Sequence, residues 1–166
     1  MGLPVSLELP PLGYPADVTP HTSELRLPAD RHYVIVAKRA AAGFAAVAGL
    51  DVEALDDLVI AVAQACENTI SLCERAAGPG CGQIRLVFSL ADRALEVQVK
   101  SSLTRAELEA AARRRAAAAQ AALEARLREA DEMALRVMGL FVDDFGYRVD
   151  ERTGGMRVRL TKYLVK

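Results

Sequence analysis

The stretch from Asp51 to Ala77 constrains the fold more than any other part of the sequence. Residues suited to burial recur there every three or four positions, the period of one face of an α-helix: Val52, Leu55, Leu58, Val59, Val62, Cys66, Thr69 and Cys73. Asp51 is a favourable N-cap, and Gly78-Pro79-Gly80 cannot continue a helix. The chain therefore needs a second layer that covers a long apolar helix face.

Alternating apolar residues predict the strands of that layer. Residues 84–90 and 95–99 alternate on either side of a turn at 91–93, which is typical of a β-hairpin. A short strand around Leu25 and Leu27 stops at Pro28, and a closing hairpin turns at residues 153–155. These patterns predict a sheet built largely from hairpins.

Two further helices are expected. One begins near Asp30 and ends at Gly49. The other begins with a capping box at Thr104 and runs without a strong break to about Phe145, although its first half, residues 105–122, has little apolar surface. The order of elements predicts an α+β fold, a two-layer sandwich spanning residues 22–166, preceded by a proline-rich arm at 1–21.

Charge and cysteine content exclude several classes of protein. Lys and Arg number 21 against 22 Asp and Glu, a net charge of −1, so we expect neither a nucleic-acid nor a membrane partner. The 3 cysteines lack CxxC spacing, and only His21 and His32 could join them as zinc ligands. We therefore expect reduced thiols and a cytoplasmic location. The excess of arginine over lysine and the abundant alanine suggest a GC-rich bacterial genome.

Three segments together resemble the anti-sigma-factor serine kinases of the histidine-kinase-like (GHKL) ATPase superfamily. They are Leu27-Pro28-Ala29 followed by Tyr33-Val34, the run from Asp57 to Val62 leading to Ala65-Cys66-Glu67-Asn68, and Thr161-Lys162-Tyr163-Leu164. The resemblance implies a histidine-kinase-like ATPase fold with a mixed β-sheet. It also implies a Mg-ATP site and, as partners, a sigma factor or an anti-sigma antagonist.

Asn68 matches the family's magnesium ligand, because an amide oxygen suits Mg²⁺, and it lies on a polar stripe of its helix that is predicted to face away from the core. The family's catalytic acid, four positions earlier, is Gln64 here. An amide cannot accept a proton as a general base, and losing such a base costs about 10² to 10⁴ in rate. Gln64 therefore argues against efficient phosphorylation of serine.

Two more subsites depart from the family pattern. Ser101 stands where the resemblance places the aspartate that binds adenine, and Leu103 stands where it places a glycine. The equivalent of the glycine-rich ATP lid reads Asp131-Glu132-Met133-Ala134, inside the expected long helix, and its carboxylates would repel phosphate. With three subsites altered, we expect a vestigial nucleotide site and no bound cofactor.

The first hypothesis is a non-catalytic regulatory protein, a degenerate member of the family that binds a sigma factor, an anti-sigma antagonist or a second copy of itself. An alternative is an active serine/threonine kinase that uses Mg-ATP, with Glu67, Asp131 or Glu132 as the acid. Another alternative is a small-molecule sensor that uses the abandoned pocket.

Other polar residues have simpler interpretations. Gln64, Asn68, Ser71 and Arg75 form either a ligand pocket or a helix face that is solvated or internally hydrogen-bonded. The run at 113–115 binds phosphate or an acidic partner, or is a solvated face. The weakly apolar residues 105–122 suggest pairing with a second subunit or a cover over the old pocket, and a homodimer is expected.

Overall fold

The computed structural model describes residues 20–117, 129, 132–150 and 155–164 of the chain. In chain order the elements are β1 (His21–Pro28), the short 3-10 helix η1 (Arg31–Tyr33), α1 (Val34–Ala48), α2 (Val52–Ala77), β2 (Gln83–Ala91), β3 (Ala94–Ser102), α3 (Arg105–Ala117), β4 (Asp144–Val149) and β5 (Met156–Tyr163). Residues 132–138 are also helical. The expected arm lies outside the described residues up to residue 19, and His21 already belongs to β1.

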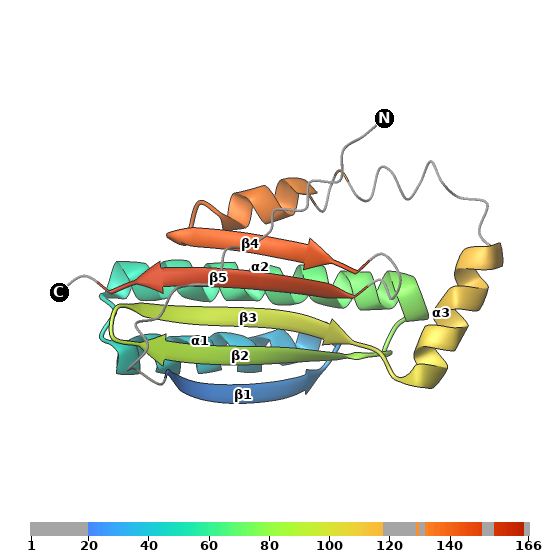
Figure 1. Cartoon of the computed structure of the whole chain (residues 1–166), viewed down its shortest axis with the longest axis horizontal. Helices are drawn as coiled ribbons and strands as arrows, with labels where there is room; N and C mark the ends of the chain where they lie inside the picture. Colours follow the sequence, from blue (N-terminus) through green and yellow to red (C-terminus); the bar gives the residue numbers. More distant parts are fainter. Residues whose placement is uncertain (1–19, 118–128, 130–131, 151–154, 165–166) are drawn as a thin grey trace.

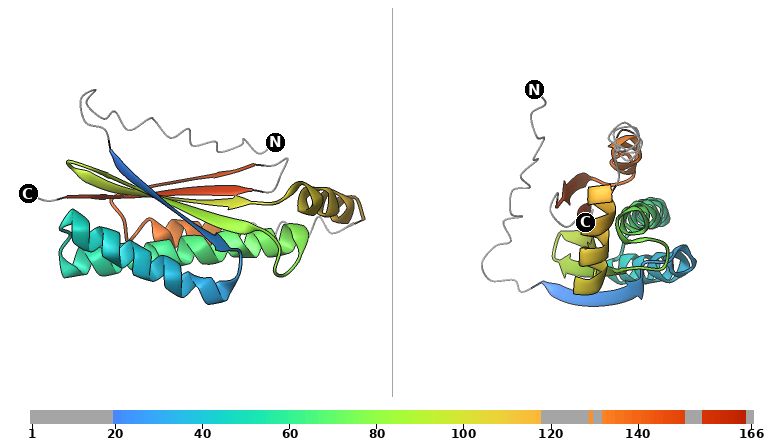
Figure 2. Two further views of the ribbon diagram at one scale, coloured as in Figure 1. Left: turned by 90° about the horizontal axis from the view of Figure 1, so that it is seen from below. Right: turned by 90° about the vertical axis from the view of Figure 1, so that its right-hand side faces the viewer.

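The five strands form one sheet in the order β1-β2-β3-β5-β4, and α1 and α2 lie side by side against one of its faces (Figure 1, Figure 2). The predicted α+β two-layer sandwich is confirmed. The predicted hairpin is also present, with β2 and β3 paired from Gln83 opposite Ser102 to Ala91 opposite Ala94. In the closing pair, β5 lies inside the sheet between β3 and β4, so β4 forms the edge.

Local signals set the ends of α1 and α2 as expected. The Asp51 side chain accepts a hydrogen bond of 2.8 Å from the backbone N–H of Ala54, which caps α2. Gly49 ends α1 with a φ of 77°, a left-handed conformation that glycine adopts without steric cost. The helix near Asp30 begins with η1, where the Asp30 carboxylate accepts from the backbone N–H of His32.

The sheet is antiparallel at each described strand pair, so the mixed sheet implied by the family resemblance is not found. The connection between β1 and β2 explains this. Two helices separate them, so the chain runs back along the sheet in α1 and returns in α2. As a result β2 starts beside the end of β1, with Gln83 opposite Pro28. A single crossover helix would have made the two strands parallel.

The core lies between the sheet and the two helices. Phe88 of β2 stacks on Phe44 of α1 with ring centroids 4.3 Å apart. Most of the other fully buried side chains are aliphatic and include Leu58, Ile70, Leu86, Leu95, Met138 and Leu160. At the far end of β5, Lys162 reaches the Asp57 carboxylate of α2 at 3.4 Å and joins the sheet to the helix layer.

The uninterrupted helix expected from Thr104 to Phe145 is wrong. α3 and the helical residues 132–138 run in different directions, α3 at one end of the sheet and residues 132–138 beside β4 (Figure 1, Figure 2). Residues 139 and 140 form a turn, and β4 begins at Asp144. Alanine-rich composition favours helix at each position, but it does not hold two helical segments on one axis when each packs against a different part of the fold.

Candidate functional site

Gln64 and Asn68 lie one turn apart in the middle of α2, and their side chains contact each other. Nε2 of Gln64 donates a hydrogen bond of 3.0 Å to Oδ1 of Asn68. Asn68 is only 8% exposed, which corrects the expectation that it faces away from the core. The reason is tertiary: α2 is the central helix and contacts α1, α3, β2, β3 and β5, so little of its surface reaches solvent.

These two amides, in the orientation found, are poorly suited to a magnesium ion. Mg²⁺ binds through oxygen lone pairs, and one of the two lone pairs of the Asn68 oxygen already accepts from Gln64. The other Asn68 atom, Nδ2, is buried and has no hydrogen-bond partner among the described residues. A buried N–H donor attracts an acceptor and repels a cation. The pair therefore presents a donor where the family resemblance implies a metal ligand.

The rest of the polar stripe on α2 does not join this pair. Ser71 accepts a hydrogen bond of 3.1 Å from Nη2 of Arg31 in η1, and the same guanidinium lies 3.5 Å from the Glu74 carboxylate. Ser71 therefore connects α2 to η1 rather than lining a pocket with Gln64. Arg75 is exposed.

Ser101 is also engaged in internal structure. It lies near the end of β3, and its hydroxyl oxygen accepts a hydrogen bond of 2.8 Å from the backbone N–H of Met156 at the start of β5. It also lies beside the Cys73 thiol. Burial raises the pKa of Cys73 to about 11, and the hydrogen bond from Ser101 opposes that rise. Ser101 thus joins β3, β5 and α2, and its hydroxyl is already engaged in internal hydrogen bonds.

Leu103 packs against Gly82, at the point where the resemblance implies a glycine. A Cβ placed on Gly82 would lie 2.9 Å from Cδ2 of Leu103, so the two residues leave no free space between them. Glu107 closes the same region. Its carboxylate accepts from the backbone N–H of Gly82 at 2.9 Å and from that of Thr104 at 2.7 Å, and the expected capping box is confirmed.

The region equivalent to the ATP lid is described only in part. Asp131 lies outside the described residues, and Glu132 and Met133 are exposed. In the basic run, Arg114 lies over the end of α2, because a Cβ on Gly78 would be 2.8 Å from its Nη1 atom. A cation at a helix C-terminus is favourable, so Arg114 has a structural role there. Arg113 is exposed, and the side chain of Arg115 is not described.

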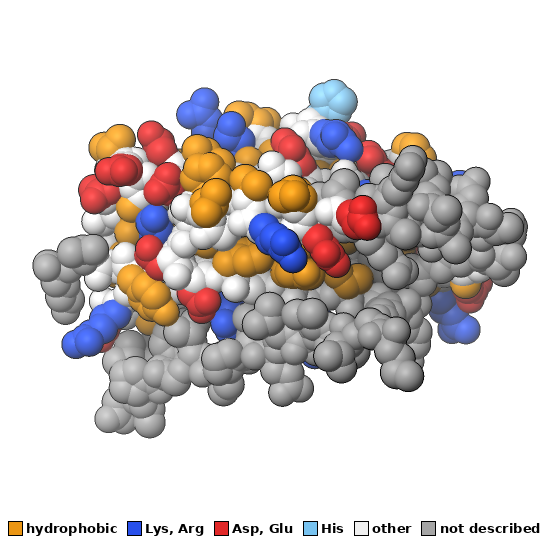
Figure 3. Space-filling view, turned by 90° about the horizontal axis from the view of Figure 1, so that it is seen from above, with side chains coloured by type: hydrophobic (Ala, Val, Ile, Leu, Met, Phe, Trp, Pro, Cys, Tyr) orange, Lys and Arg blue, Asp and Glu red, His pale blue; other side chains and the backbone are white. Residues whose placement is uncertain are grey.

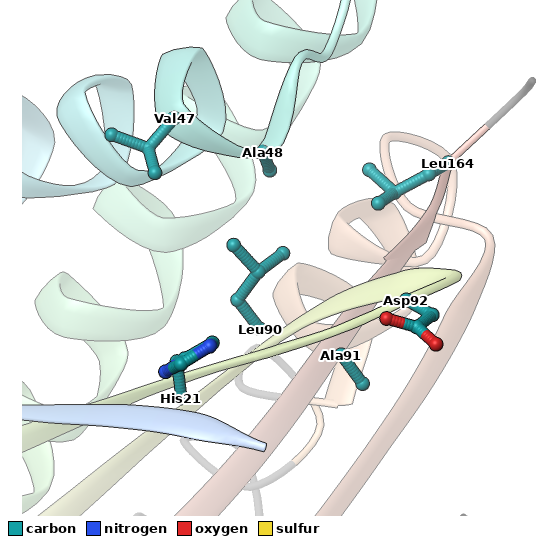
Figure 4. A pocket seen from close by; sticks show the side chains of 7 residues that line it. All are labelled: His21, Val47, Ala48, Leu90, Ala91, Asp92 and Leu164. Carbon is teal, nitrogen blue, oxygen red and sulfur yellow. The ribbon is translucent and has the colours of Figure 1, made fainter. Parts of the chain in front are cut away.

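Sequence reasoning missed the small pocket shown in Figure 4, which has a volume of about 260 Å³. It lies where β2 turns into β3, whereas Ser101 is at the other end of β3. Its lining residues come from separate elements and have no common motif: His21, Val47, Ala48, Leu90, Ala91, Asp92 and Leu164. Among the described residues, no group of three or more acidic, histidine or cysteine side chains is arranged to hold a metal.

Residues 27–162 match the family model for the histidine kinase-like ATPase domain. The chain is similar to the serine-protein kinase RsbW of Listeria monocytogenes serovar 1/2a, with 31% identity over 145 residues, 84% of this chain and 85% of that protein. It is 29% identical over 140 residues to RsbW of Listeria innocua, with the same coverage. RsbW of Bacillus cereus is 32% identical over 76 residues, 46% of each chain.

Proposed function

The chain belongs to the histidine-kinase-like ATPase domain family and, within it, to the RsbW-like serine-protein kinases, and from this premise we propose that it is a regulatory binding protein that has lost nucleotide chemistry. The observation that carries the proposal is the hydrogen bond from Gln64 to Asn68. It engages one lone pair of the oxygen that a magnesium ion needs, and it does so with a side chain that cannot act as a base.

The other altered subsites support the same conclusion. Ser101 uses its oxygen to hold β5, and Leu103 fills the space beside Gly82. A nucleotide base that approached the backbone at Gly82 would have to displace the Leu103 side chain. Gln64, Ser101 and Leu103 are thus each integrated into the packing or the internal hydrogen bonds, which is expected of a site no longer used for a ligand.

We propose a sigma factor or an anti-sigma antagonist as the partner, together with a homodimer. Exposed apolar side chains support a protein-binding role. Met133 and Val137, one turn apart in the helical residues 132–138, are 62% and 43% exposed, and Leu140 in the turn that follows is 80% exposed. The face that carries residues 132–138 shows hydrophobic side chains gathered between charged ones (Figure 3).

The thiols of Cys66, Cys73 and Cys81 are free, which supports a reducing, cytoplasmic location. Among the described residues, no helix has the length and apolar character needed to cross a bilayer.

Isothermal titration calorimetry with Mg-ATP and Mg-ADP tests the loss of nucleotide binding. We expect no binding with a dissociation constant below about 100 μM, equivalent to about −5.5 kcal/mol. The matched variant is Gln64→Glu/Ser101→Asp/Leu103→Gly, which restores the residues that the family resemblance implies. Binding by the unchanged protein contradicts the proposal, and binding by the triple variant alone supports it strongly.

A phosphorylation assay with the unchanged protein tests the alternative that the chain is an active kinase. Glu67 is exposed on α2, three positions after Gln64, and it is the described acid nearest to Gln64 along the helix. The protein is incubated with labelled ATP and a purified anti-sigma antagonist, beside a Glu67→Gln variant. Phosphoserine that forms with the unchanged protein and disappears with Glu67→Gln would establish the kinase and overturn the proposal.

Light scattering coupled to size-exclusion chromatography measures the oligomeric state. We expect twice the mass of one chain. A monomeric mass at all accessible concentrations contradicts the homodimer, but it does not bear on the proposed loss of nucleotide binding.

A further inference from the structure

One row of cationic side chains crosses the whole sheet. The strand register places Arg26 opposite Arg85, Arg85 opposite Lys100, Lys100 opposite Arg157, and Arg157 opposite Arg148. Each strand of the sheet contributes one cation at the same level. These residues, here named the basic row, come from distant parts of the sequence and form no run or motif along it.

The basic row points away from α1 and α2. Its neighbours along the strands, such as Leu27, Val99 and Val158, are buried in the core, and successive side chains of a strand point to opposite faces. Arg26, Arg148 and Arg157 are exposed, and Arg85 and Lys100 are half-buried. The row therefore lies on the face of the sheet that is turned toward the viewer in Figure 1.

The charge of the row is compensated at one end only. Glu24 pairs with Arg26 and with Arg85, both at 2.5 Å. Lys100, Arg148 and Arg157 form no ion pair with any carboxylate in the described part of the chain. Like charges directly opposite each other in a sheet are destabilising. The pKa of Lys100 is lowered, first by burial and then by Arg157 and Arg85.

We propose that the basic row is a docking surface for the acidic face of an α-helix on a partner protein. Adjacent strands are roughly 4.8 Å apart, so the five cations span roughly 19 Å. A helix rises about 5.4 Å per turn. A helix laid across the strands with one carboxylate per turn therefore brings one anion close to each cation of the row.

The surroundings of the row favour a narrow anionic partner over nucleic acid. Glu24 lies two residues along β1 from Arg26, on the same face, and Asp144 lies on the row beyond Glu24, where it pairs with Arg159 at 3.5 Å. Glu96 shares the row of Asp144 but is buried. A wide polyanion that covered the sheet would approach the Glu24 and Asp144 carboxylates as well as the cations. The net charge of −1 also gives no general attraction for nucleic acid.

This inference goes beyond the proposed function, since it does not depend on whether a nucleotide binds. Its test contains no nucleotide. The docking surface can therefore be wrong while the proposed loss of nucleotide binding is right, and the reverse also holds. The probe is an alanine-based helical peptide of about 18 residues with one glutamate per turn on one face. A second peptide carries glutamine at the same positions. Fluorescence anisotropy measures the binding of each labelled peptide to the full chain.

The variant Lys100→Gln/Arg157→Gln removes the uncompensated centre of the row. We expect it to bind the glutamate peptide at least about five-fold more weakly, because it loses two ion pairs of ordinary surface strength. The matched control is Arg39→Gln/Arg93→Gln, which removes the same charge from exposed residues outside the row and should bind unchanged. Because like charges are removed, the row variant should unfold at the same temperature as the unchanged protein or higher.

Salt should weaken the binding of the glutamate peptide between about 50 and about 300 mM NaCl, while the glutamine peptide should not bind measurably. The proposal is overturned by equal binding of the two peptides or by equal weakening in the control variant. Binding of a short DNA duplex more tightly than the glutamate peptide, with the same dependence on Lys100 and Arg157, would assign the row to nucleic acid instead.

Discussion

Gln64 and Asn68 are hydrogen-bonded to each other inside α2, with Nε2 of Gln64 3.0 Å from Oδ1 of Asn68. The donor and acceptor roles matter more than the distance. A carboxylate at position 64 would also accept, and it would leave the Asn68 oxygen to another ligand. The amide instead donates to that oxygen and keeps it within the protein.

The variant Gln64→Met tests this arrangement. It removes the donor with little change in side-chain volume and leaves the buried Asn68 oxygen without the hydrogen bond from residue 64, so we expect the free energy of unfolding to fall by about 1–2 kcal/mol. Urea denaturation at pH 7 measures the loss. Unchanged stability would contradict the hydrogen bond between the two side chains.

Glu107 holds the start of α3 against the loop before β2. Hydrogen bonds from the backbone of Thr104 and then of Gly82 lower the pKa of this carboxyl below its ordinary value of 4.5. Because the folded pKa is the lower one, its stabilising effect is present above the ordinary value and lost as the pH falls through the lowered one. We expect Glu107→Gln to cost about 0.5–1 kcal/mol at pH 7 and nothing at about pH 2, as measured by urea denaturation.

The control for this prediction is Glu109→Gln. Glu109 pairs with Arg105 on the exposed side of α3 at 3.3 Å, and such pairs contribute about 0.3–0.5 kcal/mol. If the two variants lose equal free energies of unfolding at pH 7, the hydrogen bond between Glu107 and Gly82 adds nothing to the stability of the protein.

Gly82 is expected to reject even a methyl group. Its φ of 87° is strained for other residues, and a Cβ would lie 2.9 Å from Leu103 and 3.2 Å from the sulfur of Cys73. We expect Gly82→Ala to destabilise the protein by at least about 1–2 kcal/mol in thermal or urea unfolding. The matched control is Gly43→Ala in α1, where nothing lies within 4 Å, and it should stabilise by about 0.5–1 kcal/mol. Adding Leu103→Ala to Gly82→Ala should recover part of the loss, whereas no recovery would deny the contact.

The three cysteines should differ sharply in reactivity. Burial raises the pKa of Cys66 to about 12 and that of Cys73 to about 11, so neither forms a thiolate readily at neutral pH. Cys81 is half-buried. A thiol reagent added to the native protein at pH 8 should modify Cys81 first, and the variant Cys81→Ser should remove that phase. Rapid labelling of Cys66 in the native protein would contradict the buried core position of α2.

Local patterns in the sequence determined most of the secondary structure. The period of α2, the alternation of β2 and β3, the stop at Gly49 and the capping box at Thr104 each depend on residues within a turn or two of one another. Such signals depend only on residues that are close in the sequence. They wrongly predicted one helix from Thr104 to Phe145, because helix propensity there is uniform and packing decides the path of the chain.

The burial of the candidate site and the alignment of the basic row were decided by the tertiary structure. The sequence identified Gln64, Asn68, Ser101 and Leu103 as departures from a family pattern or matches to it, but it placed Asn68 on an outward face. Only the packing of α2 among five neighbouring elements buried that side chain, and only the strand register aligned Lys100 with Arg157. Burial and strand register depend on contacts between residues far apart in the sequence, and the periodicity of the sequence does not predict such contacts.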